Sequence, residues 1–384
     1  MMITIIGPDD PALNVLDRTL KGLPGQPGKL EIIPWAEYQP RLMATLAAKE
    51  APHQAVFIPG HVWLPELAQA GHLAALDEIP APANEAAEHP VTDFLRAMLP
   101  AVADECHYQG KPYELPVFSD GHILFYREDL LGESISALSN ESTPVISPLE
   151  LGKLAAQVHH PPQIYGLALK AHPSEIFLDW LPFLWQAGGD IMDEGGRPIF
   201  ASQAGVHALE TYCALRVYCP PDTHLYGNAE IANAIREKRV AMATTWGGQA
   251  GPLFSAQPEP AYRCAVFPKP WNATWGVAIP ANQSPELQEQ VLHLLMQVLN
   301  PESDLQVIQA AGSPVRRGSY TPDFMRTFAW LPAQRTMLEL CGRLPALPEL
   351  GRFLGVLYPA VYKAFTGELT PRAALEAAQK QVTE

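Results

Sequence analysis

Strand-like and helix-like segments alternate over the first sixty residues of this 384-residue chain. Short apolar runs at residues 3–6, 30–33 and 55–58 predict strands, and residues 11–23 and 36–49 between them predict amphipathic helices. The first helix carries Leu13, Leu16 and Leu20 along one stripe. Because this alternation is typical of βαβ units, it predicts a mainly parallel sheet covered by helices.

The length of the chain predicts two lobes, because one hydrophobic core seldom grows beyond about 250–300 residues. A cleft between the lobes is then a natural ligand site. The net charge of −15, from 26 Lys and Arg against 41 Asp and Glu, argues against nucleic acid and anionic lipid as partners. The apolar segments are too short or too interrupted to predict a transmembrane helix.

The cellular location stays open at this stage. The start Met-Met-Ile-Thr-Ile-Ile-Gly lacks the charged and long apolar regions of a secretory leader. Five cysteines, an odd number without metal-binding spacing, leave at least one thiol unpaired or paired between molecules, which favours the cytosol slightly. The alternative is a protein outside the cytoplasm whose secretory leader has been removed ahead of Met1.

The sequence contains no common catalytic or nucleotide-binding motif. The GxSxG, GxxxxGK[ST], HExxH and helix-opening GxGxxG patterns are all missing. The pair His159-His160 and the acidic group Asp190, Asp193 and Glu194 are better explained as polar turns than as metal sites. We therefore predict no cofactor and no metal, and the absence of catalysis is an expectation that comes from the family resemblance described below.

The run from His107 to Leu130 holds a predicted hairpin and two predicted strands. Gly110 suits the tight turn of the hairpin, and Asp120 with Gly121 is expected at a bend between the strands. Aromatic and polar residues gather there and at other predicted strand ends. Indole rings stack on the C–H faces of a sugar, and carboxylates accept hydrogen bonds from its hydroxyl groups. The candidate set is Trp35, His61, Phe118, Asp120, Trp246, Gly247 and Trp275.

Several segments, in order along the chain, resemble the sugar-type, maltose/trehalose-binding-like extracellular solute-binding protein family 1 of ABC importers. They are PGHVWLPELAQAGHLAALDE from Pro59, GKPYELP from Gly110 with LFYREDLL after it, REKRVAMATTWGG from Arg236, ATWGVAIPANQS from Ala273, AGSPVRRGSY from Ala311 and FTGELTPRAALEAA from Phe365. The resemblance covers most of the chain, and the order of the motifs is more specific than any one of them.

The fold that this resemblance implies is α/β, a two-lobe periplasmic-binding-protein-like fold of type II. Mixed sheets would be flanked by helices, with the ligand cleft at the hinge. The expected first lobe is residues 1–113 plus 275–312, and the second is 114–274 plus 313–384. Crossings are expected near 113–117, 268–275 and 311–319.

The same resemblance implies roles for individual residues. Asp120 would be the acidic ligand contact, Phe118 and Trp246 aromatic contacts, and Glu175 a polar contact; Thr274 and Trp275 would form the pocket strand. Gly60 stands where many relatives keep Asp, so His61 is a possible substitute. Arg316 and Arg317 in the third crossing could reach an anionic group, although a solvated turn is the plainer interpretation.

The function implied is the binding component of an ABC importer for a mono- or oligosaccharide. Its partners would be the sugar and the membrane permease subunits, and it would be an extracytoplasmic monomer, in the periplasm or at the cell surface. The alternatives are a binder of an anionic sugar or glycerophosphodiester, a cytosolic sugar sensor, and a glycoside hydrolase that uses two cleft carboxylates.

Overall fold

The computed structural model describes residues 2–80, 89–138, 143–255 and 262–383. Within them a mixed sheet has the order β2 (Gly28–Ile33), β1 (Ile3–Pro8), β3 (Ala55–Pro59), β9 (Asn272–Ala278), β6 (Glu114–Arg127) and β7 (Met242–Trp246), and β8 (Tyr262–Ala265) also pairs with β6. Strand β1 pairs in parallel with β2 and β3, as the alternation predicted, whereas β9 and the strands beyond it pair antiparallel.

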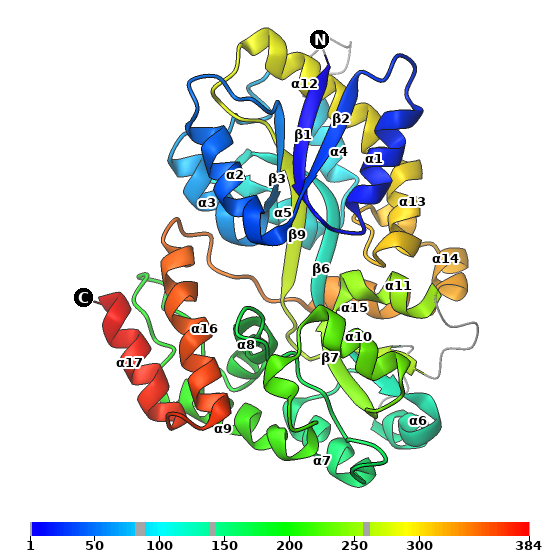
Figure 1. The fold of residues 1–384 in the computed structure, drawn as a ribbon, viewed down its shortest axis with the longest axis vertical. Helices are drawn as coiled ribbons and strands as arrows, with labels where there is room; N and C mark the ends of the chain where they lie inside the picture. The colour runs from blue at the N-terminus through cyan, green and yellow to red at the C-terminus, as the bar shows by residue number, and fades with distance from the viewer. Residues whose placement is uncertain (1, 81–88, 139–142, 256–261, 384) are drawn as a thin grey trace.

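Helices cover both flanks of the parallel strands. Helix α1 (Leu13–Gly22) packs on β2 and against α12 (Pro285–Val298) and α13 (Pro301–Ala310), and α2 (Trp35–Ala47) lies on the other side of β1 (Figure 1). Helix α3 (Gly60–Gln69) packs against β3 and β9. Leu13, Leu16 and Leu20 are all buried, which confirms the predicted stripe of α1.

Strand β6 joins the two ends of the sheet. Its first half, from Glu114, pairs with β9, and its second half, from His122, pairs with β7 and β8. The predicted bend at Asp120 and Gly121 is wrong, because β9 continues opposite these residues to Asn272 and supplies their ladder partners. The predicted connection over 268–275 is shorter for the same reason.

Gly121 is required where β6 passes other elements. A Cβ atom there would overlap the side chain of Met337 and lie 2.9 Å from the carbonyl oxygen of Trp271. The predicted hairpin is confirmed: β4 (His107–Tyr108) and β5 (Lys111–Pro112) are joined by Gln109 and Gly110, both at positive φ. Gly110 thus allows the backbone of a tight turn, and Gly121 allows β6 to pass close to Met337 and Trp271.

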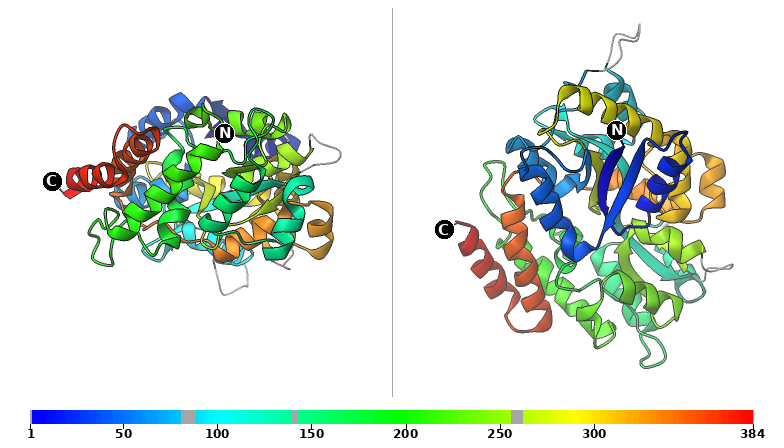
Figure 2. Two further views of the ribbon diagram at one scale, coloured as in Figure 1. Left: turned by 90° about the horizontal axis from the view of Figure 1, so that it is seen from below. Right: turned by 45° about the horizontal axis from the view of Figure 1, so that its top comes forward.

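The second half of the molecule is mostly helical. Helices α16 (Leu350–Thr366) and α17 (Pro371–Thr383) pack together and against α8 (Ile176–Gln186) and α9 (Gln203–Ala214) along one flank (Figures 1 and 2). The Ser147 and Glu150 side chains form a capping box at the start of α7 (Pro148–Val158). The helices beyond α3, apart from α12 and α13 above, are α4 (Pro90–Arg96), α5 (Pro100–Glu105), α6 (Glu128–Leu138), α7 (Pro148–Val158), α8 (Ile176–Gln186), α9 (Gln203–Ala214), α10 (Asn228–Arg236), α11 (Ala250–Ser255), α14 (Pro322–Thr327), α15 (Leu331–Leu340), α16 (Leu350–Thr366) and α17 (Pro371–Thr383).

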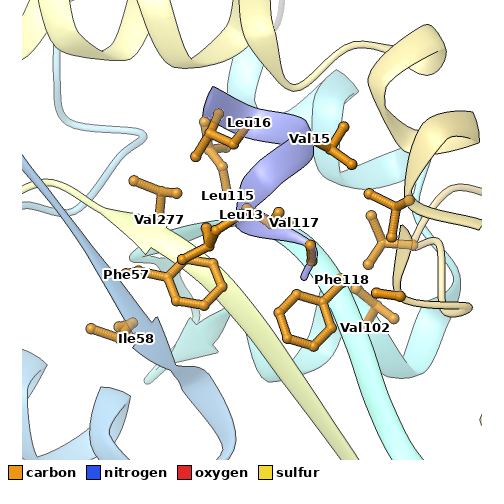
Figure 3. Close-up of a cluster of buried hydrophobic side chains, with 14 of the residues drawn as sticks. Leu13, Val15, Leu16, Phe57, Ile58, Val102, Leu115, Val117, Phe118 and Val277 are labelled. Carbon is orange, nitrogen blue, oxygen red and sulfur yellow. The ribbon is translucent and has the colours of Figure 1, made fainter. Parts of the chain in front are cut away.

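Buried apolar side chains form two clusters. One surrounds the β1–β3 region and includes Leu13, Phe57 and Phe118 (Figure 3), and the other lies among α8, α9 and α16 and includes Trp180 and Leu357. All five cysteines have free thiols. None of the helices in the described ranges is long and apolar enough to cross a membrane.

Candidate functional site

A cavity of about 580 Å³ opens between the end of β1, the start of α2, and strands β6, β7 and β9. This volume is in the range of small-molecule sites. The cavity combines tryptophan rings with acidic and amide side chains. Its lining includes Asp9, Asp10, Trp35, Asp120, Glu175, Asn228, Trp246, Trp271 and Trp275.

Four tryptophans form two edge-to-face pairs around the cavity. The ring centres of Trp35 and Trp275 are 5.3 Å apart, and those of Trp246 and Trp271 are 4.7 Å apart. Trp275 also stacks at 6.2 Å on Phe118, which is buried behind it. The rings are therefore held by packing before any ligand arrives, which lowers the entropy cost of binding.

Three carboxylates in the cavity each have one oxygen held by the protein. Asp10 Oδ1 accepts a hydrogen bond from the Ala12 amide at 2.8 Å, Asp120 Oδ1 from the Gly248 amide at 2.8 Å, and Glu175 Oε2 from the Trp246 indole at 2.7 Å. In the described parts of the chain, the second oxygen of each has no hydrogen-bond partner. Three fixed acceptors are thus available to a ligand.

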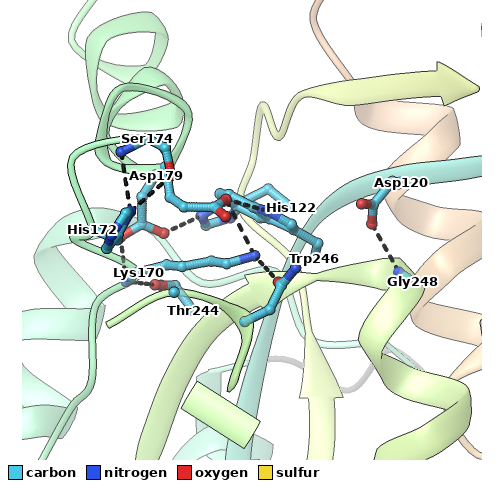
Figure 4. A network of polar contacts seen from close by, with 12 residues as sticks. Asp120, His122, Lys170, His172, Ser174, Asp179, Thr244, Trp246 and Gly248 are labelled. Atoms are coloured by element: carbon cyan, nitrogen blue, oxygen red, sulfur yellow. Dashed lines mark hydrogen bonds and ion pairs between the residues drawn. The ribbon is translucent and has the colours of Figure 1, made fainter. Parts of the chain in front are cut away.

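A buried lysine lies beneath this site (Figure 4). The Lys170 ammonium nitrogen is 3.7 Å from the centre of the Trp246 ring and 3.5 Å from Glu175 Oε2, and it donates to Asn228 Oδ1. Its backbone amide donates to Asp179, whose carboxylate also bonds His122 at 2.9 Å. Lys170 is therefore fixed from below and neutralises Glu175.

Burial shifts the protonation equilibria of the site. It raises the pKa of Asp10 from 3.8 to about 7, with the charges of Asp120 and Asp9 adding to the shift and the Ala12 amide opposing it. Burial also raises the pKa of Asp120 to about 6, against the Lys170 charge and the Gly248 amide, and lowers the pKa of Lys170 to about 8. The charge of the cavity therefore changes near neutral pH.

The structure brings five of the ten sequence-predicted residues to this cavity: Trp35, Asp120, Glu175, Trp246 and Trp275. It places Phe118 in the core behind Trp275. Thr274 points away from the cavity, because its neighbours Ala273 and Trp275 both line it and side chains alternate along a strand. Gly247 packs against the side chain of Gln334.

Arg316 lies elsewhere. Its guanidinium donates to the Leu299 carbonyl at 2.7 Å and covers the ring of Phe94, and its amide donates to Asp304. The structure therefore explains Arg316 as a packing residue near α13. The side chain of His61 is outside the described residues.

Gly60 owes its identity to packing. A Cβ atom at this position would overlap the Glu114 carboxylate, which is itself buried. An aspartate therefore does not fit here without displacing Glu114, so the departure noted in the sequence is a local steric requirement.

Sequence reasoning missed Asp9, Asp10, Lys170, Asn228 and Trp271. Asp9 and Asp10 directly follow β1, and ligands of α/β sheets bind at the carboxyl ends of such strands, so this signal was present. Lys170 precedes α8 in a segment without a recognisable pattern. Only the fold brings it next to Trp246.

The groove continues beyond the first cavity. A second cavity of about 900 Å³ shares Ser174, Leu178 and Trp275 with it. Its further walls come from α3 and α16, with Trp63 and Tyr358 as aromatic members. A ligand longer than one ring therefore has room to extend in this direction.

The fold thus holds a cavity whose walls combine aromatic and acidic side chains. Residues 24–291 match the model of the bacterial extracellular solute-binding protein family, and the chain belongs to this family. The match covers more than half of the chain. The resemblance and the two-lobe α/β fold class predicted from the sequence are thereby confirmed.

Solved structures of similar fold carry sugars and polyols. A solute-binding protein of Agrobacterium radiobacter K84 in complex with ribitol has a TM-score of 0.82 at 22% identity, covering 99% of this chain and 98% of that one. A maltose-bound protein of T. maritima has a TM-score of 0.82 at 20% identity, covering 100% and 99%. At these identities the likeness shows the fold.

A mannitol-binding protein of Pseudomonas aeruginosa is 26% identical over 207 residues. The match covers 50% of this chain and 47% of that protein, so this chain spans about half the length of the curated relative it matches.

Proposed function

We propose that this protein is the substrate-binding component of an ABC importer and that it binds a monosaccharide, a polyol or a short oligosaccharide in the tryptophan-lined cavity. The observation that carries the proposal is the meeting of packed indole rings and three available carboxylate oxygens in one cavity. The family supports a binding role without turnover.

The chemistry of the walls fits a polyhydroxylated ligand. The apolar C–H face of a sugar or polyol can lie on Trp35, Trp246 or Trp275, and its hydroxyl edge can donate to Asp10, Asp120 and Glu175. Hydrogen bonds to ionised acceptors are about twice as strong as neutral ones. Such a wall selects ligands with an apolar face and several donors on one edge.

Closure of two lobes would enclose the ligand. We propose residues 1–113 plus 275–312 as the first lobe and 114–274 plus 313–384 as the second. Asp10, Trp35 and Trp275 then belong to the first lobe, and Asp120, Glu175 and Trp246 to the second. A ligand that contacts both sets stabilises the closed form, because only differential contacts can shift such an equilibrium.

The family supports a proposal for the partner and the location. The closed protein would dock as a monomer on the membrane permease subunits of the importer, outside the cytoplasm. An anionic sugar or glycerophosphodiester is not favoured, since carboxylates line the cavity and Arg316 lies away from it.

Calorimetry tests this proposal. Titration with hexoses, pentitols, hexitols and maltose should give saturable binding for at least one ligand, with no change in the recovered ligand after long incubation. Asp120→Ala should weaken that binding more than tenfold, and Glu210→Gln on the exposed face of α9 should leave it unchanged. Absence of binding across the whole panel, or release of a hydrolysis product, would reject a pure binding role.

A further inference from the structure

We propose that the preferred ligand of the cavity is a polyhydroxylated amine, such as an amino sugar or an aminopolyol, whose ammonium group is held by Asp10 and Asp120. This inference rests on the function proposed above and narrows its ligand class. The described residues that line the cavity include four acidic side chains, Asp9, Asp10, Asp120 and Glu175, and no basic one.

The neighbouring lysine does not balance this charge. The Lys170 nitrogen is already occupied by Glu175, by Asn228 and by the face of Trp246. Its charge acts most strongly on Glu175 and, to a smaller extent, on Asp120. Four acidic groups therefore face the ligand with this lysine beside two of them.

Enclosing carboxylates that have no opposite charge beside them costs free energy, and a cation in the ligand lowers this cost. When a cavity closes and water leaves, an ionised group without an opposite charge loses its hydration. A neutral hydroxyl supplies a hydrogen bond but no charge, whereas an ammonium supplies charge-assisted hydrogen bonds to the free oxygens of Asp10 and Asp120. The ammonium ligand is therefore favoured over its hydroxyl counterpart.

The tryptophans support a cation in the same place. Indole faces attract cations, and Lys170 on Trp246 is an example within the site itself. Trp35 lies next to Asp9 and Asp10, and its indole N–H donates a hydrogen bond to the backbone carbonyl oxygen of Asp9 at 3.0 Å. The residue is 48% exposed. It thus offers an open ring beside the free carboxylates.

When no ligand cation is bound, protonation of the carboxyl groups is the other way to remove their negative charge. Burial raises the pKa of both Asp10 and Asp120, with Asp9 and Asp120 facing the first and Lys170 and Glu175 facing the second. Near pH 6 these carboxyls therefore hold protons for part of the time. An ammonium ligand would displace the protons, whereas a neutral polyol would not need to.

The experiment compares ligand pairs that differ in one group: glucosamine with glucose, and 1-amino-1-deoxysorbitol with sorbitol. Calorimetry at pH 7.5 and low salt should show at least one amine binding more than tenfold tighter than its hydroxyl partner. Its affinity should rise at least tenfold from pH 5.5 to 7.5, and titrations in buffers of different ionisation enthalpy should show proton release on binding.

Two variants locate the ammonium. Asp10→Asn and Asp120→Asn should each weaken amine binding more than tenfold and weaken binding of the matched neutral ligand by a clearly smaller factor, because asparagine keeps an acceptor oxygen for a hydroxyl but loses the charge; Glu210→Gln should change neither. Proton release is measured on the wild-type protein, so this part of the test remains even if a variant does not fold. Neutral ligands that bind as tightly as amines would overturn this inference and leave the proposed function standing. No binding of either kind would overturn both.

Discussion

The ammonium group of Lys170 lies 3.7 Å from the centre of the Trp246 ring, and the N–H of the same ring donates to Glu175, the ion-pair partner of Lys170. The lysine, the carboxylate and the indole therefore hold one another in a closed triangle. Such coupled groups contribute non-additively, because removing one leaves the others without a partner. The orientation of Trp246 thus depends on a buried charge.

Lys170→Met should weaken both stability and binding. The substitution leaves Glu175 without its cation, which we expect to cost about 1–3 kcal/mol of unfolding free energy, since Glu175 keeps some contact with water. Denaturant unfolding measures this. The double variant Lys170→Met with Glu175→Gln should recover part of the loss; additive losses would contradict the coupling.

Trp35→Ala should separate binding from stability. The side chain is half exposed at the start of α2, so its removal should change the unfolding free energy by less than about 0.5 kcal/mol. Loss of a stacking ring should weaken the ligand by about 0.5–1.5 kcal/mol, a factor of roughly 2–10. Leu149→Ala, which removes another exposed apolar side chain, is the control for calorimetry. Equal affinities in both variants would argue against Trp35 as a contact.

Glu105→Gln should stabilise the protein at alkaline pH. Burial raises the pKa of Glu105 to about 7, although the Thr274 amide and the Asn272 side chain donate to its carboxylate. A raised folded-state pKa means that the folded protein holds the proton longer, so the stabilising contribution is complete below about pH 4 and is lost as the pH rises to about 7.

The glutamine keeps an acceptor for both donors and carries no charge. Thermal unfolding should therefore show equal stability near pH 4.5 and a gain of about 1–3 kcal/mol at pH 8. A gain that does not grow with pH would contradict the buried-charge explanation. Glu339→Gln, on an exposed glutamate of α15, should lack the pH-dependent gain.

Gly60→Ala should destabilise the protein, because the new methyl group would overlap the buried Glu114 carboxylate. We expect a loss of about 1–3 kcal/mol. Gly355→Ala within α16 is the matched control: nothing lies within 4 Å of a Cβ atom there, and alanine favours a helix by up to about 1 kcal/mol. Unfolding curves in which both variants lose stability equally would point to a backbone effect at Gly60 instead of a clash.

Local sequence patterns were enough to predict the three parallel strands, the two helices between them and the hairpin at Gly110, because these depend on residues close together in the chain. The course of β6 was not predictable in this way. Its polar stretch at Ser119–Gly121 resembles a turn, and only the distant residues Asn272–Thr274 provide the strand that pairs with it. Long-range pairing here overrides local preference.

The residues of the candidate site also divide into those that local sequence could predict and those that only the fold brings together. Asp120, Trp246 and Trp275 were found from strand ends and from the family resemblance, and Asp9 with Asp10 could have been found from their position after β1. Lys170 was not predictable, since a lysine before a helix is an ordinary surface residue until the fold buries it. Arg316 carried a charge that suggested a ligand, but packing against Phe94 and Leu299 explains it.

The unbroken course of β6 limits how the molecule can bend. Since one ribbon is hydrogen-bonded to β9 at its beginning and to β7 at its end, rotation of one half against the other must be absorbed as added coiling of β6 and β9 and not by a slack connector. Asp120 lies near the middle of β6, where a rotation of one half against the other would displace a residue least. Its carboxylate would then move little during closure, whereas Trp35, which lies farther from the middle of β6, would move a greater distance.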